Sequence, residues 1–316
     1  MEQKSLAGQI ALVAGATRGA GRGIACALGE AGATVYCTGR SIRGSPATKS
    51  RPETIEETAE MVTARGGSGI PVQTDHTQPD QVKALCEKIR TQHRGLDILV
   101  NDIWGGDELT EFGKTFWTVS LDKGLLMLER AVHSHIITSH FAAPLLFDRG
   151  PGLIVEITDG DFFQYRLNIF YDLVKISVIR LAFSMSYELR KRNITALALT
   201  PGFLRSEAML DGFGVTEETW REAGNQDPNF LVSESPLYVG RAVVALASDP
   251  QVSKKSGRVF SSWDLAEEYG FTDEDGSRPN WTRHFEQKYG KYAKCDEAFY
   301  AYWRNGGGEL AFPDWP

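Results

Sequence analysis

Short apolar runs rich in β-branched residues alternate along this chain with longer segments of helical periodicity. Such alternation is typical of a parallel sheet that is covered by helices on both faces. The runs predict seven strands, at residues 10–14, 34–38, 69–73, 97–100, 153–157, 195–199 and 258–261. Helices are expected at residues 21–31, 54–65, 79–94, 123–147, 171–192 and 236–247. The sequence therefore predicts an α/β fold with a Rossmann-type, doubly wound, seven-stranded parallel sheet.

The 316 residues are expected to divide into a domain, residues 1–262, and a C-terminal extension, residues 263–316. The extension is too rich in aromatic residues to be a disordered tail. Three arrangements are open: it packs on its own subunit, covers the active site, or clasps a neighbouring subunit. An acidic stretch in it, Asp273-Glu274-Asp275-Gly276, lacks the ligand spacing of a calcium loop and is interpreted as a solvated turn.

Composition excludes several classes of partner. A net charge of -7 gives no general attraction to nucleic acid or to an anionic membrane. No apolar run is long enough to span a bilayer, and the polar first nine residues do not resemble a signal segment, so a cytoplasmic location is expected. The four cysteines show no paired spacing, so neither a disulfide framework nor a metal site is predicted.

A glycine-rich segment follows the first predicted strand. Glycine lets a backbone turn tightly and approach a pyrophosphate, and the next helix presents unpaired N–H groups at its positive end. The alternative is an ordinary glycine-rich turn between a strand and a helix. The predicted phosphate cradle comprises Gly15, Thr17, Arg18, Gly19, Ala20 and Gly21.

Tyr171 and Lys175 stand four residues apart on a predicted helix and therefore share a face. A tyrosine with a pKa of about 10 needs a shift of roughly three units, or about 4 kcal/mol, to act as acid and base near neutral pH. One cation at about 4 Å supplies energy of that order at an effective dielectric constant near 20. The pair predicts proton transfer by Tyr171 with electrostatic help from Lys175. The alternative is an amphipathic helix in which the pairing has no function.

With these two motifs in this order, residues 5–261 resemble the short-chain dehydrogenase/reductase family. Asp264-Leu265-Ala266 and Tyr269-Gly270 look like the member 1 subgroup of that family. The resemblance implies an oxidoreductase that transfers hydride between a nicotinamide cofactor and a carbonyl or alcohol. It also implies a homodimer or homotetramer. Further cofactor contacts are implied at Asp75 on the adenine, at Asn101 beside the adenosine ribose, and at Pro201 and Gly202 near the nicotinamide, whose ribose Lys175 would hold.

The end of the second strand indicates which dinucleotide is preferred. An NAD site places an acidic residue there to bind the ribose hydroxyls. Here the strand ends at Arg40, and Arg18 lies in the glycine loop. The fixed fork of a guanidinium matches phosphate oxygens, so the sequence predicts NADP(H) in preference to NAD(H). The alternative is that both arginines are solvated surface residues.

The third catalytic position is ambiguous. The family's carbonyl-orienting serine stands thirteen residues before the tyrosine, which selects Thr158, whereas the pattern of the preceding strand selects Asp159. A hydroxyl can donate to the substrate oxygen and an ionised carboxylate cannot, so Thr158 is favoured. If Asp159 points inward, it must be protonated, select a cationic substrate or spoil the usual reaction.

The family's helix asparagine, which supports the lysine through a water, has no counterpart here. Its position falls on Ala131 or His133, and His133 is a possible substitute. An aromatic wall predicts a medium-sized apolar ketone or aldehyde as substrate. The alternative function is a catalytically drifted NADP-binding sensor or scaffold. Candidate wall residues are Trp104, Phe162, Phe163, Tyr165, Phe203 and Met209.

Overall fold

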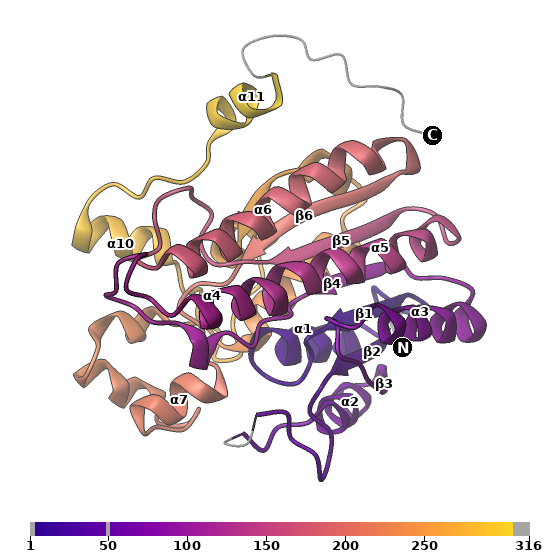
Figure 1. The fold of residues 1–316 in the computed structure, drawn as a ribbon, viewed down its shortest axis with the longest axis horizontal. Coiled ribbons are helices and arrows are strands. Elements are labelled where there is room, and N and C mark those ends of the chain that lie inside the picture. Colours follow the sequence, from indigo (N-terminus) through magenta and orange to yellow (C-terminus); the bar gives the residue numbers. More distant parts are fainter. Residues whose placement is uncertain (1–3, 49–50, 306–316) are drawn as a thin grey trace.

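Seven parallel strands form the central sheet of the computed structural model, which describes residues 4–48 and 51–305 (Figure 1). Their spatial order is β3-β2-β1-β4-β5-β6-β7, the doubly wound arrangement, so the predicted fold is confirmed. Each observed strand end lies within one residue of its prediction. The strands are β1 (Ile10–Ala14), β2 (Thr34–Gly39), β3 (Ser68–Gln73), β4 (Ile98–Asn101), β5 (Gly152–Ile157), β6 (Ile194–Thr200) and β7 (Val259–Ser261).

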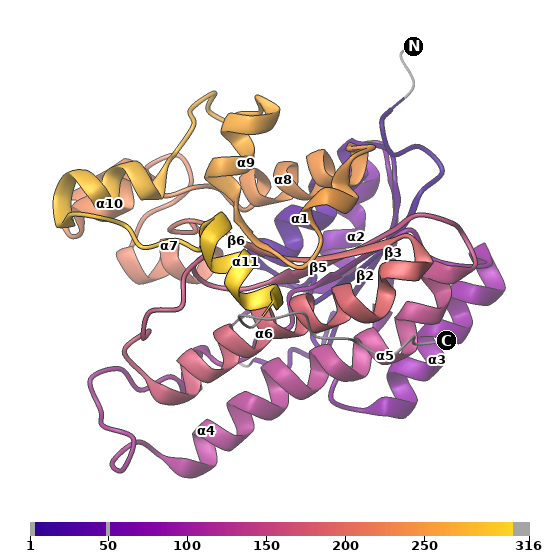
Figure 2. The same cartoon turned by 90° about the horizontal axis from the view of Figure 1, so that it is seen from above.

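Helices cover both faces of the sheet, as Figure 2 shows. One face carries α1 (Gly19–Glu30), α2 (Ile55–Ala64), α8 (Pro236–Ser248) and α9 (Ser262–Tyr269). The other carries α3 (Pro79–His93), α4 (Leu121–Leu128), α5 (Ser134–Phe147) and α6 (Ile169–Leu189). The helix predicted at residues 123–147 is observed at residues 121–147, where α4 and α5 are joined through one π-helical segment, Glu129–His133. None of the helices in the described part of the chain has the length and apolarity needed to cross a membrane.

Strand burial explains why the apolar runs were informative. β1, β4, β5 and β6 are buried along their whole length, because helices cover both of their faces. β3 lies at the edge of the sheet and alternates between exposed and half-buried residues. The central strands therefore form the rigid floor from which the loops at their carboxyl ends rise.

The residues that follow β7 continue past α9 into α10 (Trp281–Tyr289) and α11 (Glu297–Asn305). α11 lies beside the β7 edge of the sheet, where the Val259 N–H donates to the Tyr300 hydroxyl at 2.9 Å. Arg258 and Glu297 add an ion pair at the same place. α10 lies at the opposite end of this connection, near α7 (Glu207–Phe213) (Figure 2).

Two glycines allow α1 and α8 to cross at close range. A Cβ on Gly23 would stand 2.0 Å from the carbonyl oxygen of Pro236, and one on Gly240 would stand 2.6 Å from that of Gly23. These distances leave no room for a methyl group. This packing fixes the position of α1 and therefore of its amino-terminal end.

We predict that Gly23→Ala and Gly240→Ala each lower the free energy of unfolding by about 1–3 kcal/mol, because the added methyl group overpacks the helix contact. Urea unfolding measures this loss. The matched control is Gly212→Ala in α7, where a Cβ meets nothing within 4 Å; this variant should keep its stability or gain up to about 1 kcal/mol from helix propensity. Equal stability of all three variants would contradict the packing argument.

Candidate functional site

A cavity of about 1400 Å³ opens where the carboxyl ends of the central strands meet their loops. This is the edge at which doubly wound sheets bind their ligands. Nearly all of the predicted site residues line it, although they come from five different loops and two helices. They are Gly15, Thr17, Arg18, Gly19, Ala20, Arg40, Asp75, Thr158, Asp159, Tyr171, Lys175, Pro201 and Gly202.

The turn after β1 lies directly against the end of β4. Gly15 has a φ of +96°, and a Cβ there would stand 2.2 Å from the carbonyl oxygen of Asp102. A Cβ on Gly21 would stand 2.3 Å from the carbonyl oxygen of Gly15, so Gly21 supports the turn from beneath and does not line the cavity. Asp102 also accepts a hydrogen bond from the Gly21 backbone, and burial raises the pKa of this carboxyl group to about 7.

The amino-terminal end of α1 faces the cavity and already binds an anionic oxygen. Its N-cap residue, Arg18, makes no side-chain capping bond, and the Gly19 N–H donates to Oε2 of Glu207 at 2.8 Å. A carboxylate oxygen thus stands where unpaired N–H groups and the helix dipole favour negative charge. The glycine turn and this anion-binding end fit the pyrophosphate of a dinucleotide.

Asn101 points away from the cavity, although the family resemblance places it beside the ribose. Its Nδ2 donates to Oγ of Ser139 at 2.9 Å and to Oε1 of Glu156 at 2.7 Å. Glu156 is fully buried in β5, and its other oxygen lies 2.6 Å from Nδ1 of His135. Nε2 of His135 lies 3.0 Å from the carbonyl oxygen of Ile103. Both ring nitrogens of His135 are therefore engaged, one by a side chain and one by the backbone.

The histidine prediction is wrong in its position. His133 is exposed and does not line the cavity, so it does not replace the family's helix asparagine. The buried histidine is His135, two residues further on, and it supports the loop after β4 through Ile103. The signal in the sequence for such a buried partner was Glu156, an acidic residue within an otherwise apolar strand.

At the end of β5, Asp159 faces the tyrosine and Thr158 does not. The Tyr171 hydroxyl donates to Oδ2 of Asp159 at 2.7 Å, whereas the Thr158 hydroxyl donates to the backbone oxygen of Lys175 at 2.8 Å. The prediction that Thr158 is the third member of the site is therefore corrected: Asp159 is the residue that faces Tyr171. Neighbouring residues at a strand end point to opposite sides, and β5 presents residue 159 to the Tyr171 hydroxyl.

Burial and nearby carboxylates both shift the pKa values of Tyr171 and Lys175. Burial raises the pKa of Tyr171 well above its ordinary value, and the Asp159 carboxylate raises it further. Burial lowers the pKa of Lys175, while the carboxylates of Asp159 and Asp102 oppose that shift. The Lys175 ammonium lies 4.2 Å from the ring centroid of Trp104 and 5.4 Å from that of Tyr171, so both aromatic faces contact the cation.

Four arginines line the opposite end of the cavity: Arg18, Arg40, Arg51 and Arg130. Glu53 pairs with two of them, at 3.2 Å from Nε of Arg18 and through a short ion pair with Arg51. In the described ranges 4–48 and 51–305, Arg40 has no acidic partner. Burial lowers the pKa of Arg130, and the nearby Arg40 lowers it further.

Pro201 and Gly202 follow β6 and line the cavity near Tyr171. The Gly202 N–H donates to Oε2 of Glu234 at 2.9 Å, and the Ser262 hydroxyl donates to the same oxygen at 2.6 Å. Burial raises the pKa of Glu234 to about 8. This carboxyl group fixes the loop after β6 to the start of α9.

Comparison with known proteins agrees with this geometry. A family model described as Enoyl-(Acyl carrier protein) reductase matches residues 15–259. The chain is 36% identical over 274 residues to Dehydrogenase/reductase SDR family member 1 of Mus musculus, which covers 85% of this chain and 84% of that protein. The Homo sapiens protein of the same name is 34% identical over 279 residues, with the same coverage of 85% and 84%. The chain belongs to the short-chain dehydrogenase/reductase family.

The fold of a solved short-chain dehydrogenase from Mycobacterium thermoresistibile is also similar, with a TM-score of 0.73 and 23% identity. That match covers 87% of this chain and 92% of the other. The present chain is accordingly an oxidoreductase, and a nicotinamide dinucleotide is the cofactor of its family.

In this short-chain dehydrogenase/reductase, three aromatic side chains of the C-terminal extension line the same cavity: Trp281 and Phe285 of α10, and Tyr292. The Tyr292 hydroxyl donates to the buried Asp161 carboxylate at 2.7 Å. Of the wall residues expected from the sequence, four line the cavity and two do not. Those that do are Trp104, Phe162, Phe203 and Met209; those that do not are Phe163 and Tyr165.

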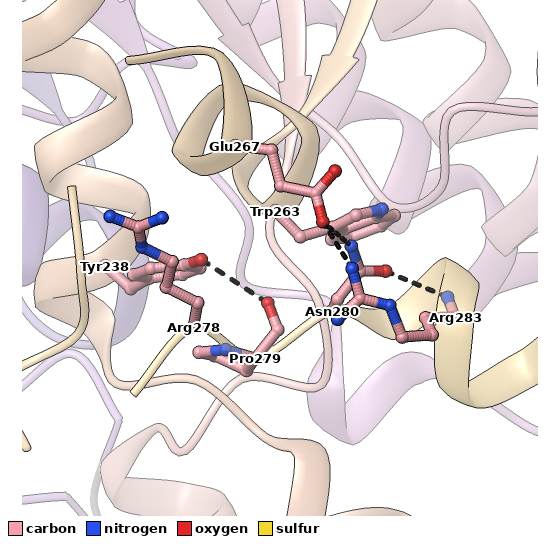
Figure 3. Close-up of a pocket in the computed structure, with 7 residues that line it drawn as sticks. All are labelled: Tyr238, Trp263, Glu267, Arg278, Pro279, Asn280 and Arg283. Carbon is pink, nitrogen blue, oxygen red and sulfur yellow. Dashed lines mark hydrogen bonds and ion pairs between the residues drawn. The ribbon is translucent and has the colours of Figure 1, made fainter. Parts of the chain in front are cut away.

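Figure 3 shows how the start of α10 is anchored beside a small second cavity. Glu267 of α9 accepts from Nδ2 of Asn280 at 2.9 Å and from Nη2 of Arg283 at 2.8 Å. The Asn280 side chain caps α10 by accepting from the Arg283 N–H. Behind them, the indole of Trp263 donates to Thr282 at 2.9 Å. A single carboxylate thus joins α9 to the helix that covers the site.

We predict that Glu267→Ala loosens this anchor and makes residues 270–290 about threefold or more susceptible to limited proteolysis, because cleavage reports local opening. The matched control is Glu268→Ala, since Glu268 stands next to it on α9 but pairs with Lys255 at 2.7 Å. Equal cleavage rates in the two variants would show that Glu267 does not hold α10.

Proposed function

We propose that this chain is an NADP(H)-dependent oxidoreductase that interconverts a carbonyl group and an alcohol, with Tyr171 as acid and base. The observation that carries the proposal is the meeting of Tyr171 and Lys175 with the anion-binding turn of α1 in one cavity. Bound reduced nicotinamide supplies the hydride. The residues of the chain supply the remaining requirements, namely a proton, a positive field and a closed pocket.

The pKa of Tyr171 is shifted opposite to the direction that acid and base work near neutral pH requires. Burial and Asp159 raise it, so the hydroxyl remains protonated across neutral pH and is a weaker acid than a free tyrosine; it gives up its proton only as an adjacent oxygen gains negative charge. Lys175 stabilises that charge from the other side of the tyrosine ring. The reverse reaction needs the phenolate, which the same shift makes scarce. The electrostatics therefore favour reduction at neutral pH, with alcohol oxidation increasing as the pH rises.

The basic end of the cavity supports NADP(H) over NAD(H). Arg18 precedes the second glycine of the turn, and Arg40 directly follows β2, where an NAD site has an acidic residue. Glu53 partly neutralises Arg18. Arg40 lines the cavity without an acidic partner in the described part of the chain and is therefore the principal candidate for the 2'-phosphate.

We predict that Tyr171→Phe lowers kcat by about 10²–10⁴-fold, the usual contribution of a positioned proton donor, and leaves NADPH affinity unchanged. NADPH oxidation and fluorescence titration measure the two effects. Tyr165→Phe is the matched control, because Tyr165 is exposed and lies outside the cavity lining. Unaltered turnover in Tyr171→Phe would sink the acid–base role, and NADPH binding without turnover on any carbonyl would favour a sensor or scaffold.

We predict that Arg40→Ala weakens NADPH binding by about 10–100-fold and leaves NADH binding unchanged, since a lost hydrogen bond to a charged group costs about 1.5–3 kcal/mol. Isothermal titration with both dinucleotides measures the difference. Arg43→Ala is the control on the same loop, because Arg43 is exposed and ion-paired with Glu60 at 2.5 Å. Equal losses for NADPH and NADH would argue against a 2'-phosphate contact.

A further inference from the structure

The cavity is divided by charge. The arginines gather around the glycine turn, with Glu108 near Arg130, whereas the exposed carboxylates of Asp107 and Asp159 lie beside Tyr171. Two cations lie close to this acidic end. Lys175 is stacked on Trp104. Arg166 is buried, and its donors are used by Asp172 and by the backbone oxygens of neighbouring residues.

Aromatic rings surround the same acidic end. Trp104 and Phe112 pack edge-on against Tyr171, with centroid distances of 5.5 and 5.6 Å. Phe162, Trp281 and Phe285 add further apolar wall. Aromatic rings beside exposed carboxylates form the kind of site that binds an organic cation, because the ring quadrupole and the ionic charge both attract it. A neutral ketone would use the rings and gain nothing from the carboxylates.

Asp159 lies where the reacting atom of the substrate must come. Its Oδ2 is 2.7 Å from the Tyr171 hydroxyl, so an atom that takes a proton from Tyr171 stands next to this carboxylate. A carbonyl oxygen becomes more negative as it receives hydride at its carbon and is repelled there. The nitrogen of a protonated C=N group is positive before the transfer and is attracted. Among double bonds that accept hydride, the site therefore suits a C=N bond better than a C=O bond.

We propose that this enzyme reduces the C=N bond of aromatic imines in their protonated, iminium form, with Asp159 selecting the cation. The proposal rests on the proposed nicotinamide-dependent function and names its substrate class. Hydride from the reduced nicotinamide forms the new C–H bond, the π pair passes to nitrogen, and the products are an amine and NADP⁺. A neutral imine takes its additional proton from the Tyr171–Asp159 pair. The pair regains a proton from water through Asp159, which is exposed.

The test uses two compounds with one bicyclic skeleton, 3,4-dihydroisoquinoline as the imine and 1-tetralone as the ketone. For the wild-type chain we expect kcat/KM with NADPH to favour the imine by about tenfold or more, the effect of one nearby charge. Asp159→Asn should remove the preference, and Asp159→Ser, which restores a donor, should shift it toward the ketone. Glu188→Gln, an exposed charge change far along α6, is the control and should behave as wild type.

A binding measurement tests the proposal independently of turnover. With the NADP⁺-loaded enzyme, 1,2,3,4-tetrahydroisoquinoline, a cation at neutral pH, should bind about tenfold or more tightly than neutral 1-tetralol, and Asp159→Asn should abolish the difference. Reduction of the ketone but not the imine, or a cation preference that survives Asp159→Asn, would overturn the imine proposal and leave the reductase intact. Failure to bind NADPH would overturn the proposed function itself.

Discussion

The geometry of the site depends on how closely the turn after β1 approaches the end of β4. Gly15 makes that approach possible, since a Cβ there would collide with the backbone of Asp102. Because the two loops touch, the amino-terminal end of α1 opens toward the same space as Trp104 and Tyr171. A larger residue at position 15 would separate the anion-binding turn from the catalytic helix. This backbone contact thus helps to hold the anion-binding turn and Tyr171 in one cavity.

Beneath this contact, a buried polar network replaces apolar packing. Asn101, His135 and Glu156 connect β4, α5 and β5 through hydrogen bonds of 2.6–2.7 Å. Buried charges are costly unless they are paired and fully bonded, and here the carboxylate meets both an imidazole and an amide. The network fixes the ends of β4 and β5 relative to each other. These are the strands that present Asp102 and Asp159 on the two sides of Lys175.

The strand pattern could be predicted because each run is buried by helices on both faces, and a run such as residues 194–200 has no other stable environment. The identity of the residue facing Tyr171 could not. A shift of one residue at the end of β5 exchanges Thr158 for Asp159, and no local propensity determines it. His133 failed for a different reason. Its position was inferred by counting residues along the chain, and such a count does not show which way a side chain in the π-helical segment Glu129–His133 points.

Contacts made far along the chain were also beyond local reasoning. Trp281 and Phe285 reach the cavity only because α9 and Glu267 turn the extension back toward Tyr171. The aromatic composition showed that the extension packs against something, but composition carries no direction. What the sequence did contain was the acidic residue at position 159, and its consequence for the substrate emerges only when its distance to the Tyr171 hydroxyl is known.

α7 contacts the amino-terminal end of α1 and also contributes to the cavity wall. Glu207, the first residue of this helix, binds the Gly19 N–H at the phosphate end, while Met209 on the same helix lines the cavity. A dinucleotide phosphate and the Glu207 carboxylate compete for the same donor, so filling the phosphate site favours positions of α7 in which Glu207 is displaced. Whatever moves Glu207 also moves the wall that contains Met209. By linkage, a substrate that prefers the displaced wall must in turn strengthen cofactor binding.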